Sequence, residues 1–315
     1  MSAGAAVRVR TGRVVAVMAL LAGCQPAGVT APPALPQPIS ITQVTGPDAE
    51  TRAARIRYRQ IEAFDLKQGL LRIDGGGPDT PFDATDLADN FMQIAFFDEF
   101  REKNEQLVSG GAQQVLHRWQ GPLRVRIEFD TTLDAAEQAR DSADIAAYFA
   151  RLARLTGLDI RMASDRANFI VAIAGPAAKR NLAARIVAFA PETSGAALNS
   201  VTAMRDDIYC TVFSYSPGRS PVYDRAFAVI RAELPPLMRR MCYHEELSQA
   251  LGLVNDSPRA RPSIFNDNEE FAYLTRQDEL MLRMLYDRRL RPGMTLREAR
   301  PIVDAIAKEL KPDAS

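Results

Sequence analysis

The segment from Glu245 to Asp256 constrains the fold of this chain more than any other part of its sequence. Polar residues stand at Glu245, Glu246 and Gln249 among leucines, and Gly252 follows before the segment ends. Residues i and i+4 of a helix lie on one face, so Glu245 and Gln249 should point the same way. Because glycine suits the left-handed residue that ends many helices, Gly252 should mark the end of this one. The segment predicts a largely buried helix with one polar face.

The spacing of these residues resembles the metzincin signature H-E-x-x-H-x-x-G-x-x-H of zinc peptidases. In that signature a general base follows the first histidine ligand, and a glycine turn precedes the third. Here Glu246 stands at the position of the base and Gly252 at that of the glycine. The three histidine positions are occupied by Glu245, Gln249 and Asn255. The resemblance implies a peptidase-like fold in which the usual zinc ligands are replaced.

A second part of the resemblance lies after this helix. The turn Ser263–Asp267 stands where metzincins have their Met-turn, with Phe265 in place of the methionine. Thr275 can then cap a closing helix that ends at Tyr286. Within this region, the stretches 244–256, 262–267 and 285–294 resemble still more closely a family of bacterial lipoproteins known as domain of unknown function 2927. That family implies a peptidase-like fold and gives no activity.

The hydrophobic pattern predicts an α+β fold, with a metzincin-like mixed sheet and helices packed on it. Leu123 to Phe129 alternates as a half-buried strand does. Asp134 and Glu137 can form the capping box of the helix that follows. Further strands are expected at 159–162, 168–174, 209–215 and 226–231, and further helices at 176–189 and from residue 235 or 236.

The N-terminus is typical of a bacterial lipoprotein precursor. A basic region precedes a short apolar stretch, which ends in Leu-Ala-Gly before Cys24. We therefore expect a signal peptide at 1–23 and a lipid on Cys24; an ordinary secretory signal is the alternative. Because residue 25 is Gln25 rather than aspartate, the expected location is the periplasmic face of the outer membrane. The proline-rich segment 24–48 should be a tether between the lipid and the folded part.

Beyond the tether, three parts are predicted. These are an N-terminal extension at 49–114, the metzincin-like domain at 115–290 and a C-terminal helix at 291–315. The chain has 39 basic and 39 acidic residues, without a basic stripe, so nucleic acid is not an expected partner. The expected partners are the membrane, through the lipid, and an envelope protein, peptide or glycan.

Two cysteines remain after Cys24, and in an oxidising compartment they predict a disulfide. The bond between Cys210 and Cys242 should tie a strand to the start of the signature helix. Two buried free thiols are the alternative.

The histidine content limits the metal chemistry of the predicted site. The chain has only His117 and His244, so a three-histidine zinc site is impossible. His244 lies about 100° around the helix from Glu245, which favours a packing or hydrogen-bonding role over metal ligation. We therefore expect no metal cofactor.

The replacing residues Glu245, Gln249, Asn255 and Asp256 offer only oxygen atoms to a cation. They suit a polar network that fills the former metal site; a weakly held divalent cation with oxygen ligands is the alternative. Glu246 at the base position should pair with an arginine, such as Arg239, Arg240 or Arg283, if it is not catalytic.

Two functions from different classes follow from this pattern. The first is a non-catalytic lipoprotein that uses the cleft of a degenerate peptidase for binding or scaffolding. The second is a metal-dependent peptidase or other hydrolase with non-standard ligands and Glu246 as general base. A domain with a purely structural role is a third reading. The histidine count favours the first.

Overall fold

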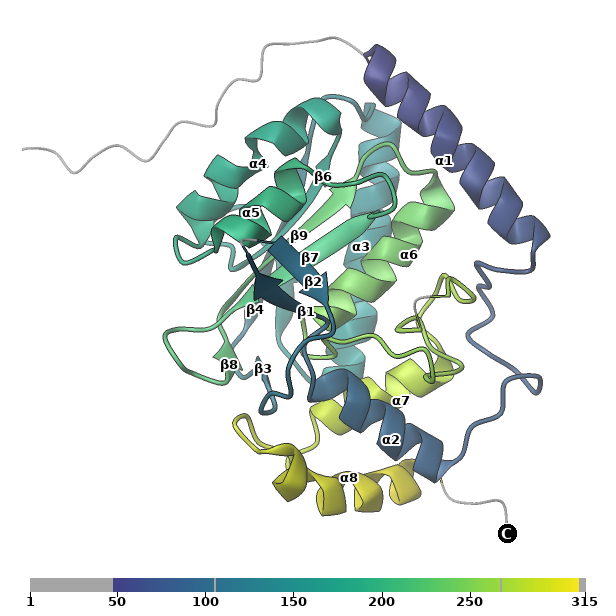
Figure 1. The fold of residues 1–315 in the computed structure, drawn as a ribbon, viewed down its shortest axis with the longest axis vertical. Coiled ribbons are helices and arrows are strands. Elements are labelled where there is room, and N and C mark those ends of the chain that lie inside the picture. Colours follow the sequence, from purple (N-terminus) through teal and green to yellow (C-terminus); the bar gives the residue numbers. More distant parts are fainter. Residues whose placement is uncertain (1–47, 105, 267, 312–315) are drawn as a thin grey trace, which may run out of the picture. The chain divides into compact units, whose positions relative to one another are not determined.

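A five-stranded mixed sheet forms the centre of the computed structural model, which describes residues 48–104, 106–266 and 268–311 (Figure 1). The strand order is β5-β4-β6-β9-β7. Four strands run parallel, and β7 pairs antiparallel with β9 at one edge. The strands are β4 (Leu123–Phe129), β5 (Ile160–Met162), β6 (Phe169–Ala174), β7 (Cys210–Tyr215) and β9 (Arg225–Arg231).

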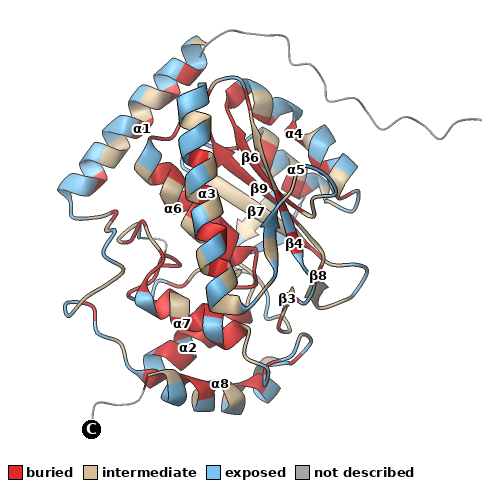
Figure 2. Cartoon of the chain, turned by 180° about the vertical axis from the view of Figure 1, so that it is seen from behind, coloured by how far each residue is buried: buried red, intermediate tan, exposed pale blue. Residues whose placement is uncertain are grey.

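Helices cover both faces of the sheet, because side chains of successive strand residues point to opposite sides. On one face, Val171 and Ala228 join the core formed with α3 (Ala135–Thr156) and α6 (Pro236–Gln249). On the other, Ile170, Phe227 and their neighbours pack against α4 (Pro176–Phe189) and α5 (Gly195–Thr202). The central strands β6 and β9 are consequently almost wholly buried, as Figure 2 shows.

Three further helices pack on one another beside this core. They are α2 (Ala84–Ala95), α7 (Arg276–Leu285) and α8 (Leu296–Leu310). The N-terminal helix is α1 (Ala49–Lys67), and two short pairs of strands complete the fold. They are the antiparallel pair β1 (Phe100–Lys103) and β2 (Gln106–Ser109), and the parallel pair β3 (Arg118–Trp119) and β8 (Val222–Tyr223).

The predicted α+β class and its main elements are confirmed. The capping box of Asp134 and Glu137 begins α3 as expected. Thr275 is the N-cap of α7, and the helix predicted from Pro235 or Pro236 begins at Pro236. The hairpin β1–β2 and helix α5 are not foreseen from the sequence.

The predicted signal peptide, Cys24 and nearly all of the tether lie outside the described residues. Among the helices that are described, none has the length and apolar character needed to cross a bilayer.

Candidate functional site

Helix α6 carries the predicted site and is buried on most of its surface. It follows β9 after a short connection and begins at Pro236, where proline costs no hydrogen bond because the first-turn N–H groups are free anyway. The burial predicted for this segment is confirmed, since its leucines Leu247, Leu251 and Leu253 are fully buried. Polar groups on the same helix therefore need partners inside the protein.

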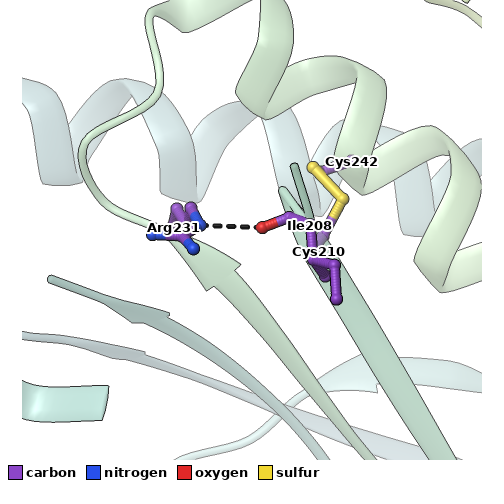
Figure 3. The surroundings of a disulfide bond; sticks show 4 residues. All are labelled: Ile208, Cys210, Arg231 and Cys242. Carbon is purple, nitrogen blue, oxygen red and sulfur yellow. Dashed lines mark hydrogen bonds between the residues drawn. A yellow bond between two sulfur atoms is a disulfide. The ribbon is translucent and has the colours of Figure 1, made fainter. Parts of the chain in front are cut away.

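The predicted disulfide is present and joins α6 to the edge strand β7 (Figure 3). The Cα atoms of Cys210 and Cys242 lie 5.9 Å apart. Beside it, Nε of Arg231 donates a hydrogen bond of 2.7 Å to the carbonyl of Ile208, which holds the approach to β7. One detail of the prediction is wrong: Cys242 lies in the middle of α6, one turn before Glu246, and not at its start. The helix begins before Cys242, because Pro235 is its N-cap and Pro236 its first residue.

The disulfide lies next to two glutamates of the predicted site. A carboxylate oxygen of Glu245, one of Glu246 and the sulfur of Cys210 are all within 4.8 Å of one another. This is the kind of spacing that a metal requires, but a sulfur in a disulfide is not a thiolate and binds metals poorly. Only the two carboxylates remain as strong donors of this set.

Glu246 is buried, with an exposed fraction of 5%. Burial raises the pKa of its carboxyl well above the ordinary value, and the negative charge of Asp256 raises that pKa further. Asp256 also accepts a hydrogen bond of 3.4 Å from Nε2 of Gln249. The structure thus brings Glu246, Gln249 and Asp256 together, one turn from the disulfide.

Two of the three arginines expected to neutralise Glu246 bind other carboxylates. Arg239 pairs with Asp141 at 3.0 Å, and Arg240 pairs with Asp144 at 2.6 Å, both on α3. Arg283 on α7 is exposed, whereas Glu246 is buried. The predicted arginine partner is therefore wrong. Arg239 and Arg240 connect α6 to α3 through their ion pairs instead.

Asn255 turns away from this cluster toward α2. Its side-chain Nδ2 donates to the carbonyl of Gln93 at 3.0 Å, and its backbone N–H donates to the carbonyl of Ile94 at 3.1 Å. These carbonyls lie in the last turn of α2, where helices leave carbonyls without partners. Asn255 therefore closes the end of a neighbouring helix.

His244 lies between two aromatic rings. The ring centroids of Tyr148 and Tyr273 are 4.1 and 4.7 Å from that of His244, and all three rings are nearly parallel. Its Nδ1 accepts a hydrogen bond of 2.8 Å from the backbone N–H of Leu274. Burial, together with the charges of nearby arginines, lowers the pKa of His244 to about 3, so the ring is neutral at physiological pH. These contacts agree with the expected packing role.

Gly252 is required for a reason beyond the end of the helix. It has a φ of +123°, and a side chain there would collide with the carbonyl oxygen of His117. The last helical residue of α6 is Gln249, three residues earlier. Gly252 thus permits the close approach of the chain before β3.

The turn around Phe265 is fixed by a carboxylate that the sequence analysis missed. Asp278 on α7 is completely buried and accepts hydrogen bonds from Oγ of Ser263 at 2.5 Å and from the N–H of Ile264 at 3.1 Å. It also completes the capping box with Thr275. That capping pattern is visible in the sequence and could have indicated Asp278. Phe265 itself is fully buried, and its carbonyl accepts from the N–H of Ser257 at 2.8 Å, which joins the turn to the segment after α6.

A comparison with known protein families identifies the family of this chain. Residues 84–305, more than two thirds of the chain, match the model of a family described as protein of unknown function DUF2927. The chain belongs to the DUF2927 family. The match spans α2, the whole sheet, α6 and α7, and most of α8. Neither the curated proteins nor the solved structures contain a match to this chain.

The disulfide of this DUF2927 chain should contribute strongly to its stability. Its loop spans 32 residues, for which chain-entropy models give roughly 3–4 kcal/mol. The double variant Cys210→Ala/Cys242→Ala should lose about that free energy of unfolding in urea titrations, and each single variant should lose a similar amount. Unchanged stability in the double variant, or free thiols in the native protein, would contradict this.

The buried carboxyl of Glu246 predicts a pH-dependent contribution to stability. Its pKa is higher in the folded chain than in the unfolded one, so the folded state keeps a proton that the unfolded state releases. This contribution is fully present below about pH 4.5 and is lost as the pH rises through the folded pKa. Glu246→Gln should therefore flatten the fall in unfolding free energy toward alkaline pH.

Urea titrations at a series of pH values measure this effect. The matched control is Glu102→Gln, which makes the same substitution at an exposed residue of β1, and comparison with it isolates the effect of the buried carboxyl. Parallel profiles for Glu246→Gln and the wild type would refute the buried-carboxyl assignment.

Proposed function

We propose that this DUF2927 protein is a cell-envelope lipoprotein whose degenerate metallopeptidase-like domain binds a partner without catalysing hydrolysis. The partner would be an envelope protein, a peptide or a glycan. The observation that carries the proposal is the set of groups around Glu246, where a peptidase of this type would hold its metal.

The arrangement of elements supports the metallopeptidase-like part of the proposal. A mixed sheet ends in one antiparallel edge strand, β7, and β9 leads directly into the helix with the signature spacing. After that helix, the buried turn at Phe265 is joined by hydrogen bonds to both the Ser257 segment and α7. A peptidase of the metzincin type needs this same order of sheet, helix and turn to enclose its metal.

The contacts of His244 and of the replacing residue Asn255 support the non-catalytic part. A zinc peptidase needs neutral nitrogen donors and a water whose pKa falls to about 7 on the metal. Here His244 is held by Leu274 and two tyrosine rings, and Asn255 binds the backbone of α2. The sulfur of Cys210, which lies beside Glu245 and Glu246, belongs to a disulfide. Glu246 would then have no activated water on which to act.

One observation favours the hydrolase as a second candidate. The oxygens of Glu245 and Glu246 lie close together, and the pKa of Glu246 is raised, which is common for catalytic acids and bases. An oxygen-ligated calcium, magnesium or manganese ion could use the same pair. That reading requires metal-dependent activity that disappears in Glu246→Gln.

Metal content and activity together distinguish the two functions. Protein purified without chelator should contain far less than one zinc per chain by mass spectrometry. With added zinc, calcium or manganese it should not cleave denatured protein substrates. Glu246→Gln should behave like the wild type in both assays. Stoichiometric zinc, or metal-dependent cleavage abolished by Glu246→Gln, would establish the hydrolase instead.

The proposed envelope location rests on Cys24 and its context. Cys24→Ala should prevent lipid attachment, so metabolic labelling with a fatty acid should mark the wild type and not the variant. The variant should also remain unprocessed by the lipoprotein signal peptidase. A processed, membrane-bound Cys24→Ala protein would contradict anchoring through a lipid on Cys24.

A further inference from the structure

Helix α1 lies on the outside of the molecule, at the right-hand edge of Figure 1, and the family match, which begins at residue 84, does not include it. One face of the helix is fixed to the rest of the protein. On this face the hydroxyl of Tyr58 donates to the carbonyl of Asp206 at 3.1 Å. The buried residues of α1 recur at helical spacing and are Thr51, Ala54, Tyr58 and Asp65. The opposite face of α1 is therefore turned to solvent.

Large apolar side chains are concentrated on this outward face. Among the described residues, seven large hydrophobic side chains are exposed, and three of them are on α1. Ile56, Phe64 and Leu66 have exposed fractions of 53, 62 and 49%. At about 100° per residue, all three lie within about half of the helix circumference. Single exposed apolar residues need no explanation, but several on one helix face indicate a contact with something outside the chain.

The charged side chains on the same face are all basic. Arg52, Arg59 and Lys67 are exposed and lie between the apolar residues when the helix is viewed along its axis. Within α1, which the structure describes in full, no exposed acidic residue follows Arg52, since Glu62 is half-buried and Asp65 is buried. The outward face therefore combines apolar surface with positive charge.

The acidic groups that adjoin this face are paired. Glu50 in the first turn of α1 binds Arg180 at 3.4 Å, and Asp206 binds Arg57 at 2.8 Å. The whole chain carries 39 basic and 39 acidic residues, so its net charge gives no general attraction to an anionic surface. The positive charge of α1 is therefore local and acts on a partner that contacts this face.

Basic and apolar side chains together match the surface of an anionic bilayer. Helices that lie in the headgroup region present Arg and Lys to the lipid phosphates, and Phe, Leu or Ile to the start of the acyl chains. A nucleic acid would attract the basic residues but would leave Phe64 and Leu66 without apolar contacts. The composition of the face thus favours a lipid surface.

The position of α1 in the sequence favours the same partner. The helix begins at Ala49, and under the proposed lipid attachment only the segment 24–48 separates it from the lipid on Cys24. A short linker keeps the module attached to it at an effective concentration on the order of millimolar. A weak affinity of the helix face is then enough for lasting contact with the bilayer.

We propose that the exposed face of α1 binds the surface of an anionic phospholipid bilayer and so fixes the orientation of the domain on the membrane. The residues that form this face are Arg52, Ile56, Arg59, Phe64, Leu66 and Lys67. This inference rests on the proposed envelope location and deepens it, because it adds a membrane contact of the folded domain to the lipid anchor.

Lipid-free protein tests this contact separately from the anchor. The whole mature chain, residues 25–315, is mixed with vesicles of equal parts phosphatidylglycerol and phosphatidylcholine, or of phosphatidylcholine alone. Co-sedimentation measures the bound fraction. The chain should bind the anionic vesicles and not the neutral ones. Raising the salt concentration from about 0.05 M to about 0.5 M should weaken binding, because salt screens exposed charges.

Substitutions on α1 should weaken vesicle binding by predictable amounts. Each basic residue near an anionic surface strengthens binding roughly fivefold, so Arg59→Gln/Lys67→Gln should bind roughly 25-fold more weakly. Phe64→Ser should bind at least about tenfold more weakly, because it removes a large apolar contact with the bilayer. All three residues are exposed, so these variants should unfold at the same temperature as the wild type.

Strand β1 supplies matched controls, because Phe100, Arg101 and Lys103 are exposed there as well. Arg101→Gln/Lys103→Gln and Phe100→Ser make the same kinds of substitution on a different element. Both control variants should bind the anionic vesicles as the wild type does.

Three results would overturn the inference. They are an absence of binding to anionic vesicles, equal binding to neutral vesicles, and α1 variants that bind as tightly as the β1 controls. An absence of fatty-acid label on Cys24 would instead overturn the proposed lipid anchor and leave a positive vesicle result standing.

Discussion

The burial of helix α6 is the constraint on which the rest of the structure depends. The helix packs against the sheet and against α3, so its polar groups need partners within the protein, and a buried polar group without a partner costs about 1–3 kcal/mol. Ser248 donates to the carbonyl of His244 and contacts the hydroxyl of Tyr148 at 2.6 Å. Trp119 donates to the carbonyl of Ala250 at 2.8 Å. These contacts fix the position of the helix through hydrogen bonds within the protein.

The same constraint fixes the position of the edge strand β7. The disulfide attaches one end of β7 to the middle of α6, and Oγ of Ser214 near the other end of β7 lies 3.4 Å from the carbonyl of Ala250. Gly252 then lets the backbone of His117 approach the end of the helix. Strand β7 is therefore attached to α6 near both of its ends, and its first residue, Cys210, lies beside Glu245 and Glu246.

Many helices and strands of this fold can be predicted from local sequence patterns. The bonding partners of individual side chains cannot be predicted in this way. The alternation at Leu123–Phe129 and the capping pairs at Asp134 and Thr275 specify elements through contacts a few residues apart. The disulfide follows from a count of cysteines. By contrast, the binding of Asn255 to α2 joins residues 162 positions apart, and no sequence spacing indicates it. The prediction of an arginine partner for Glu246 is wrong for the same reason. Asp141 and Asp144, which are distant in sequence, bind Arg239 and Arg240 instead.

The direct test of this account is a carbon-13 NMR titration of the Glu246 carboxyl, with and without equimolar zinc. If internal contacts replace the metal, the pKa of Glu246 lies well above its ordinary value of 4.5, the titration is coupled to that of Asp256, and zinc changes neither. An ordinary pKa, or a carboxyl signal that shifts when equimolar zinc is added, would contradict the account.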